Sequence, residues 1–298
     1  AAAADTAELT EELAAQLLAT DDAGEPKRVG AAYRLAELGA DSALPVLRGG
    51  LWHERENVRR AATYGLVSLG DAATDVFLAA AADRLRWVRK AGAFGLGEAG
   101  SLTDAVRLGL RTRLLEDTSV YVRSVAASSL GCFGRRAAAN GARGLIPGVV
   151  ADLLDSLDVE ENRLGMDRAQ RRSIKFVRPT DACDVCEGIG IDYGQERFDP
   201  VRSAVRENAL WSLVMLCSHG AEALGDTQAR AVSTFIDIAR NDRNIFNVGF
   251  ALDCLQRLAS LPGGEAALAA ELHALLEALP LQPWDTLGRS GPVTMPAS

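Results

Sequence analysis

The segment VRRAATYGLVSLG, residues 58–70, decides the fold because it recurs along the chain in one register. Near copies are VRKAGAFGLGEAG at 88–100 and VRSVAASSLGCFG at 122–134, so the leading valines are 30 and 34 residues apart. Counted from the valine, apolar or small residues recur at +4, +8 and +11, which share one face of an α-helix. Self-similarity at this spacing predicts stacked helical hairpins. The closing glycine of each copy is expected to end its helix with a positive φ.

Weaker copies of the repeat extend the array toward both ends of the chain, at 27–39, 205–213 and 247–258. A partner helix is expected before each copy, with examples at 42–52, 75–85, 104–116, 145–157 and 228–239. A single hairpin cannot bury its apolar face alone, so neighbouring hairpins must stack. The sequence therefore predicts an all-α protein, a right-handed α-solenoid of about six to seven helical hairpins with one long insertion.

This pattern resembles the HEAT-repeat family of armadillo/HEAT-like α-solenoids, and the resemblance covers most of the chain. In that family an aspartate in the turn, five residues before the valine, joins the arginine after the valine in a structural ladder between repeats. The resemblance implies that this ladder contains Asp83, Asp117, Asp242, Arg59, Arg89, Arg123 and Arg206. The alternative is a functional one, in which the arginines form a row that binds an acidic partner.

Composition and charge disfavour several classes of partner. The net charge is −8 and the pI about 5.1, whereas a protein that neutralises nucleic-acid phosphates normally carries a basic face. No apolar run is long enough for a membrane span. The acidic, amphipathic N-terminal residues lack the features of a signal peptide. We therefore expect a cytoplasmic protein with no membrane association, and the acidic net charge disfavours a nucleic-acid partner.

The largest departure from the repeat divides the chain into four parts. Repeats are predicted at 1–157, an insertion at 158–199, further repeats at 200–281, and an irregular tail at 282–298 packed on the array or a neighbour. Insertions in solenoids map to one face, which is often the binding face. Within the insertion, 173–177 is expected to be extended. The arginines between 163 and 178 are interpreted as a solvated helix face paired with nearby acids, with nucleic-acid binding as the alternative.

The insertion also contains Cys183 and Cys186, whose C-x-x-C spacing suits a metal site. A structural zinc site needs four ligands, and the sequence has no second cysteine pair. A redox role needs a thioredoxin-like βαβ context, which is missing from the pattern. Structural or incidental cysteines are the main interpretation, with metal binding and redox chemistry kept open. No cofactor is predicted.

His53 occupies the position at which other repeats place the ladder aspartate. Some HEAT-repeat hydroxylases bind a di-iron centre through repeated His-Glu pairs on helices. Here a single pair, His53 and Glu54, falls at a turn, which argues against such a site. We expect His53 to satisfy a backbone group or cap a helix, and catalysis is the alternative.

Position +6 of the second helices carries a row of aromatic residues in a chain with only 5% aromatics. This position points away from the buried face, toward the concave surface or its rim. Aromatic side chains are enriched at binding surfaces, so the row predicts a partner or ligand site, although packing against adjacent repeats explains it equally well. The candidate binding residues are Tyr33, Tyr64, Phe94 and Trp211, flanked by Arg60, Lys90, Glu207, Trp87 and His53.

The sequence favours a binding or scaffold protein that holds a protein or peptide partner on its concave face. No triad, phosphate-binding loop or metal set is recognisable, so no catalytic residue is assigned. The alternative is an enzyme acting on a small molecule in a pocket between the concave groove and the 158–199 insertion. HEAT-like repeats also resemble the bilin lyases, which attach or isomerise tetrapyrroles. Such an enzyme is expected to use Cys183, Asp184, Cys186, Glu187, Asp192 and Tyr193.

Overall fold

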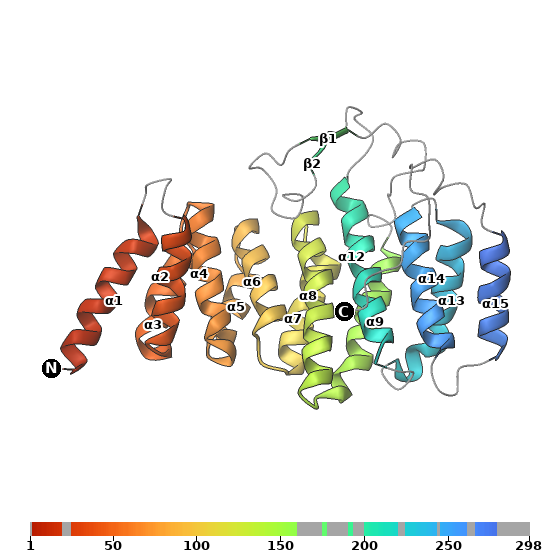
Figure 1. The fold of residues 1–298 in the computed structure, drawn as a ribbon, viewed down its shortest axis with the longest axis horizontal. Coiled ribbons are helices and arrows are strands. Elements are labelled where there is room, and N and C mark those ends of the chain that lie inside the picture. The colour runs from red at the N-terminus through yellow and green to blue at the C-terminus, as the bar shows by residue number, and fades with distance from the viewer. Residues whose placement is uncertain are drawn as a thin grey trace.

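The computed structural model describes residues 2–19, 25–159, 175–177, 190–192, 200–219, 224–242, 245–260 and 266–278. Its helices stand side by side in one elongated stack (Figure 1). They are α1 (Ala2–Leu18), α2 (Glu25–Glu37), α3 (Ala40–Leu51), α4 (Glu56–Ser68), α5 (Thr74–Ala81), α6 (Arg86–Glu98), α7 (Asp104–Glu116), α8 (Val120–Ala139), α9 (Ile146–Asp158), α12 (Pro200–Cys217), α13 (Gln228–Asn241), α14 (Ile245–Ala259) and α15 (Ala266–Ala278).

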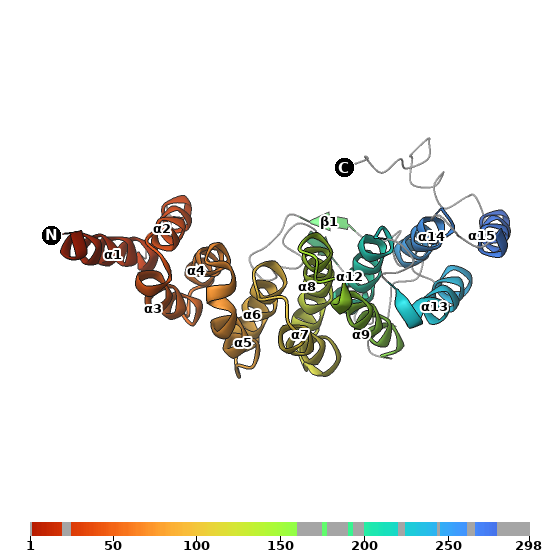
Figure 2. The ribbon, with the colours of Figure 1, turned by 90° about the horizontal axis from the view of Figure 1, so that it is seen from below.

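Consecutive helices pair into hairpins, and the hairpins stack along one axis. The described residues form the pairs α1–α2, α3–α4, α5–α6, α7–α8, α9–α12 and α13–α14, followed by α15. Figure 2 shows the second helices of these pairs in one row and the first helices, from α3 onward, in another. The array bends so that the row of second helices lies on the inner side of a shallow arc. The predicted α-solenoid of about six to seven hairpins is therefore confirmed.

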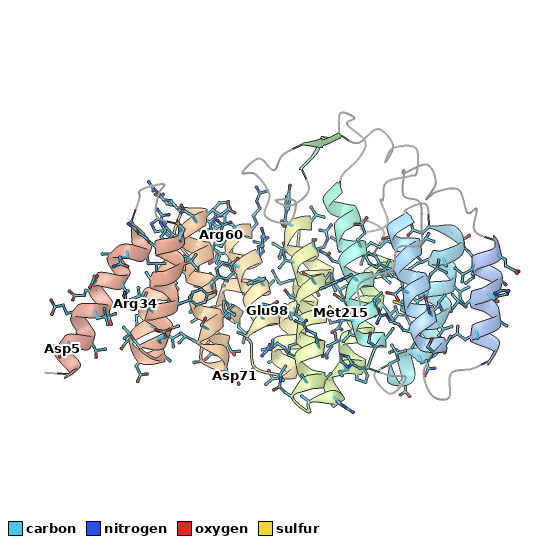
Figure 3. All side chains as sticks on the ribbon, in the orientation of Figure 1. Asp5, Arg34, Arg60, Asp71, Glu98 and Met215 are labelled. Carbon is cyan, nitrogen blue, oxygen red and sulfur yellow. The ribbon has the colours of Figure 1, made fainter. Side chains whose placement is uncertain are left out.

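The core follows the repeat register. The valine, its +4 residue and its +8 leucine are buried in α4, α6, α8 and α12, as the triplet Val58, Ala62 and Leu66 illustrates (Figure 3 shows the side chains on the helices). Burying one valine or leucine side chain contributes about 1.5–3 kcal/mol. Buried residues from α1 to α15 belong to one hydrophobic cluster, so a continuous core runs along the described array.

Small residues let the second helices approach closely in the middle of the array. A Cβ atom on Gly97 would lie 2.6 Å from the Cβ of Ser129, and one on Gly131 would lie 2.4 Å from Oγ of Ser212. Ser212 also donates a hydrogen bond to the carbonyl of Ala127 at 2.9 Å. Helix α12 thus packs directly on α8, and the insertion between α9 and α12 does not interrupt the stack.

The glycine that closes each repeat does not always end a helix. Gly70 follows α4 with φ of +61°, as predicted. The same prediction for Gly134 is wrong, because α8 continues to Ala139. In the added turn, Arg136 donates hydrogen bonds to the carbonyls of Gly97 and Gly100, at 3.1 and 2.8 Å, and Ala137 is buried. These contacts fasten the longer helix to the end of α6.

Two short strands lie within the insertion. Strand β1 (Lys175–Val177) pairs antiparallel with β2 (Gly190–Asp192), with Phe176 opposite Ile191. The extended segment predicted at 173–177 is confirmed for 175–177. Several predicted features lie outside the described residues: Cys183, Asp184, Cys186, Glu187, Tyr193 and the tail at 282–298. The insertion side of the pocket proposed between the groove and the insertion lies largely outside them too.

Candidate functional site

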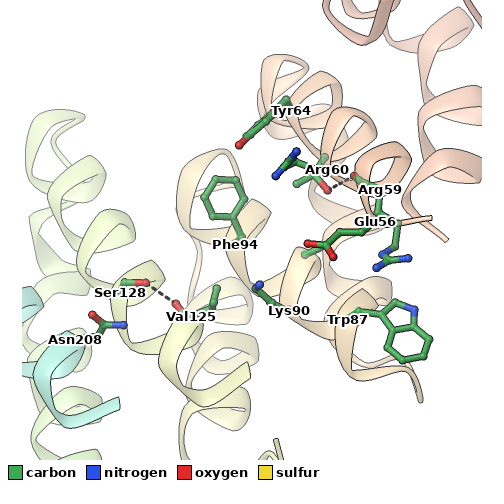
Figure 4. A pocket seen from close by; sticks show the side chains of 12 residues that line it. Glu56, Arg59, Arg60, Tyr64, Trp87, Lys90, Phe94, Val125, Ser128 and Asn208 are labelled. Carbon is green, nitrogen blue, oxygen red and sulfur yellow. Dashed lines mark hydrogen bonds between the residues drawn. The ribbon is translucent and has the colours of Figure 1, made fainter. Parts of the chain in front are cut away.

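A groove opens on the inner row of helices, between α4 and α6, and reaches α8 and α12 (Figure 4). Its volume is about 360 Å³. Cationic, aromatic and small polar side chains line it: Glu56, Arg59, Arg60, Thr63, Tyr64, Trp87, Lys90, Ala91, Phe94, Val125, Ser128 and Asn208. The groove therefore combines apolar surface with charge, which suits recognition of a ligand that carries both.

Aromatic rings form the apolar part of the groove. Tyr64 and Phe94 occupy the same position of consecutive repeats, and their ring centroids are 6.4 Å apart at an interplanar angle of 74°. Edge-to-face pairs of this kind are favourable arrangements of aromatic side chains. Trp87 lies on the other side of Lys90 and is 42% exposed. The rings leave apolar surface uncovered on the inner face of the array.

The charged part of the groove is mainly cationic. Arg59, Arg60 and Lys90 contribute three positive charges, and Glu56 contributes the one carboxylate among the lining residues. Oε1 of Glu56 is buried and accepts no hydrogen bond from any described residue. Figure 4 shows the Glu56 carboxylate pointing into the groove toward Lys90. The site therefore presents donors for an anionic group beside one acceptor for a polar hydrogen.

The structure brings together part of the predicted set of site residues. Of the nine candidates, Arg60, Tyr64, Trp87, Lys90 and Phe94 line the groove. Tyr33 on α2 and Trp211 on α12 are exposed, at 44% and 38%, but are not among the lining residues, and neither are His53 and Glu207. The +6 row therefore converges on one site only across α4, α6 and α8, where Ser128 replaces the aromatic residue.

Sequence reasoning missed Arg59 as a groove residue because it assigned that arginine to the ladder. Two rungs of the predicted arginine–aspartate ladder are present among the described residues. Arg89 binds Asp117 through Nε and Nη2, at 2.7 and 2.8 Å. Arg206 binds Asp242 through Nε at 2.9 Å. Each of these arginines therefore joins its own repeat to the aspartate of the next one.

The rung between α4 and α6 has a different arrangement. Nη1 of Arg59 donates to the carbonyls of His53 and Glu54, at 2.9 and 2.6 Å, as Nη1 of Arg89 does to two carbonyls of its own turn. The aspartate of the next repeat, Asp83, instead accepts a hydrogen bond from Nε1 of Trp52 at 2.8 Å. Among the described residues, Arg59 has no carboxylate hydrogen-bond partner, and its guanidinium lies 5.6 Å from the Trp87 ring centre.

Arg89 and Arg59 also differ in the direction of their pKa shifts. The hydrogen bonds that Arg89 donates to Asp117 raise the pKa of Arg89, even though burial opposes this. Burial lowers the pKa of Arg59, and the attraction of Glu56 only partly offsets it. Asp83 has a lowered pKa, because hydrogen bonds from Leu85 N–H and Trp52 outweigh its own burial. Arg59 is thus a partly buried cation whose charge is weakly compensated within the described chain.

His53 takes the turn role of the ladder aspartates. Its Nδ1 accepts a hydrogen bond from the backbone N–H of Arg55 at 3.1 Å. Oδ1 of Asp83 and of Asp117 accept from the N–H two residues ahead in the same way, at 2.7 and 2.9 Å. The expectation that His53 satisfies a backbone group is therefore met by this bond.

No group of three or more histidine, cysteine or acidic side chains in the described ranges is arranged to hold a metal ion. Cys183 and Cys186, the predicted metal candidates, are outside those ranges. Among the helices described, none has both the length and the apolar content that a membrane crossing requires.

Comparisons with known proteins identify the type of repeat. Residues 10–97 match the family of HEAT repeats. No curated protein matches the chain. Among solved structures, an engineered protein is 18% identical with a TM-score of 0.36, covering 90% of this chain and 95% of its own.

Two designed armadillo repeat proteins are each 14% identical. The first has a TM-score of 0.36, with 92% of this chain and 94% of that chain covered. The second, solved with the peptide (KR)4, has a TM-score of 0.35, with 93% and 90% covered. The match identifies residues 10–97 as HEAT repeats, and the ladder-linked hairpins that follow continue the same α-solenoid through the described residues.

Proposed function

We propose that the chain is a binding or scaffold protein that holds a segment of a protein partner in the groove on its inner face. The observation that carries this proposal is the groove between α4 and α6, where three aromatic side chains and three cations surround an open volume of about 360 Å³. Buried aromatic and arginine anchors supply most of the energy in protein interfaces. An extended segment or a helix fits such an elongated, open surface.

A pull-down from the native host with a groove variant tests this proposal. The double substitution of Tyr64→Ala and Phe94→Ala removes two of the three aromatic rings that line the groove. We expect it to weaken partner capture by about tenfold or more, as loss of an aromatic anchor does in interfaces. Quantitative mass spectrometry of the captured proteins is the readout, and circular dichroism checks that the array stays helical.

Tyr33→Ala is the matched control, because Tyr33 occupies the same repeat position on α2 but does not line the groove. Proteins that are lost with the double variant and kept with Tyr33→Ala support the proposal. Equal capture by the wild type and both variants would place the binding surface elsewhere and contradict it.

A further inference from the structure

The rung at Arg59 is an arginine fork that lacks its internal carboxylate. In the next repeat, Nη1 of Arg89 donates hydrogen bonds to two turn carbonyls. Its Nε and Nη2 atoms donate to the two carboxylate oxygens of Asp117. The Nη1 atom of Arg59 is fixed by two turn carbonyls in the same way. The edge of Arg59 that corresponds to Nε and Nη2 of Arg89 donates no hydrogen bond to a carboxylate of the described residues.

Asp83 does not close this fork because other donors hold its carboxylate. Oδ2 accepts from Trp52 Nε1 at 2.8 Å, and Oδ1 accepts from the N–H of Leu85 at 2.7 Å. Trp52 of the preceding hairpin thus takes the place at Asp83 that an arginine takes at Asp117. The position of Arg59 is also fixed by the Trp87 ring, which its guanidinium overlies.

We infer that the groove binds an acidic peptide segment, whose aspartate or glutamate carboxylate takes the place of the missing ladder aspartate at Arg59. This inference rests on the proposed function and names the chemistry of the partner. Arginine forks bind carboxylates in a bidentate manner, and such charge-assisted bonds are about twice as strong as neutral ones. Arg60 and Lys90 reinforce the attraction from the same groove.

The remaining lining residues define what flanks the carboxylate. Tyr64 and Phe94 offer an aromatic surface next to the cations, so an aromatic or aliphatic residue is expected beside the acidic one. Oε1 of Glu56 is a buried acceptor without a described donor, and a backbone N–H of an extended peptide supplies one. The predicted motif is an acidic residue adjacent to a large apolar residue.

A peptide fits these features better than a nucleic acid does. A nucleic acid presents a continuous row of phosphates, and Glu56 places a negative charge inside the groove. The chain as a whole also carries a net charge of −8, which repels a polyanion over its length. A peptide segment brings one or two carboxylates and apolar side chains into the same short site.

A phage-displayed library of random linear peptides, selected on the purified full chain, tests the inference. Parallel selection on the Tyr64→Ala, Phe94→Ala double variant identifies the peptides that depend on the groove. Each selected peptide is then synthesised in two forms. One form keeps its acidic residue, and the other has glutamine in place of glutamate or asparagine in place of aspartate. Their affinities for the wild-type protein are measured by calorimetry, so the acidic group is tested without altering the protein.

Three protein variants test the role of Arg59 with the same synthetic peptides. Arg59→Gln is expected to weaken binding of the acidic peptide by about tenfold to a hundredfold, the range for a hydrogen-bonded charged group. Arg59→Lys keeps the charge and loses the fork, so its affinity for the acidic peptide is expected to lie between those of the wild type and of Arg59→Gln. Arg86→Gln is the matched control, since it removes one exposed charge that does not line the groove, and its effect should stay within about threefold.

The outcomes separate the inference from the proposed function. Groove-dependent peptides that are acidic, and that lose affinity in the amide form and with Arg59→Gln, support both. Groove-dependent peptides that lack acids, or that bind equally well as amides, overturn the inference and leave the proposed function standing. No groove-dependent peptide at all overturns both. Tighter binding of a single-stranded DNA oligonucleotide than of any peptide, with a steep salt dependence whose slope falls by about 1 in Arg59→Gln, replaces the peptide by a nucleic acid.

Discussion

At the residue scale, the ladder shows how one carboxylate can hold several parts of the array together. Asp117 is 5% exposed and accepts hydrogen bonds from Arg89, from Arg113 at 3.1 Å and from the N–H of Ser119. These bonds join α6, α7 and the turn before α8. Asp83 occupies the equivalent position, but its side-chain donor is the neutral indole of Trp52. The two aspartates therefore differ in how much charge they balance.

We expect Asp117→Asn to lower the free energy of unfolding by about 3–5 kcal/mol at neutral pH, since it leaves buried arginine charge without its partner. Asp83→Asn should cost less, because it separates no ion pair. The pKa of Asp117 is lowered in the folded state, so its stabilisation is complete above the pKa of the unfolded carboxyl and declines as pH falls through the folded pKa. Urea unfolding of both variants from pH 7 to pH 3 measures this.

The difference between wild type and Asp117→Asn should shrink below about pH 4, the ordinary aspartate pKa. A difference that stays constant across this range would show that the Asp117 charge does not act as described.

The rungs at Arg89 and Arg206 could be predicted from the sequence, because each arginine and aspartate sits at a fixed place in the repeat. The open fork at Arg59 could not. It depends on a hydrogen bond between Trp52 and Asp83, two residues 31 positions apart that no repeat pattern pairs. A hint existed in His53, since a histidine in place of the first aspartate marks this hairpin as irregular. A hint of this kind locates the irregularity without giving its geometry.

At the scale of the element, helix spacing depends on a few small residues on the inner row. Gly131 of α8 faces Ser212 of α12, where a Cβ atom would lie 2.4 Å from Oγ and 2.6 Å from the serine Cβ. Both are closer than non-bonded atoms pack, so any side chain must push the two helices apart. The glycine thus sets how tightly the repeats on either side of the insertion meet.

We expect Gly131→Ala to destabilise the protein by about 1–3 kcal/mol, the usual cost of overpacking. This occurs although alanine favours helices over glycine by about 1 kcal/mol. Gly30→Ala is the matched control, because Gly30 lies inside α2 and a Cβ atom added there would meet nothing within 4 Å, and it should stabilise by about 0.5–1 kcal/mol. Thermal unfolding of both variants measures the two effects, and a shift of the same sign in both would contradict the packing argument.

Helix positions were predictable from periodicity, whereas helix ends were less so. The burial of Val58, Ala62 and Leu66 follows directly from their spacing. The extension of α8 past Gly134 depends on hydrogen bonds from Arg136 to the end of another helix, which the local sequence does not contain. Which +6 residues meet in one groove likewise depends on the distance between helices.

At the scale of the whole molecule, a chain of ion pairs runs across the outer row and joins the repeats before and after the insertion. Asp152 of α9 accepts a hydrogen bond from Arg107 of α7 and forms an ion pair with Arg111 of the same helix. One turn further on, Asp155 and Asp158 bind Arg230 of α13, at 2.8 and 3.0 Å. On the inner row, Nη1 of Arg206 donates to the carbonyl of Leu157 at 2.8 Å. Three hairpins are thereby linked by charge as well as by apolar packing.

In a linear array, stability passes only between neighbouring repeats, so damage to this chain of ion pairs should stay local. We expect Asp152→Ala to lower the free energy of unfolding by about 3 kcal/mol, because it removes the buried carboxylate partner of the half-buried Arg107. It should also speed amide hydrogen exchange in α7, α9 and α13. Exchange in α2 and α4 should not change, and neither should peptide binding in the groove. Asp104→Asn is the matched control, because Asp104 also binds Arg107 but is 69% exposed, and surface pairs contribute little. Mass spectrometry of exchanged peptides resolves the helices. A uniform rise across all helices would mean that the array unfolds as one cooperative body, and a solenoid of semi-independent hairpins would then be the wrong description of its energetics.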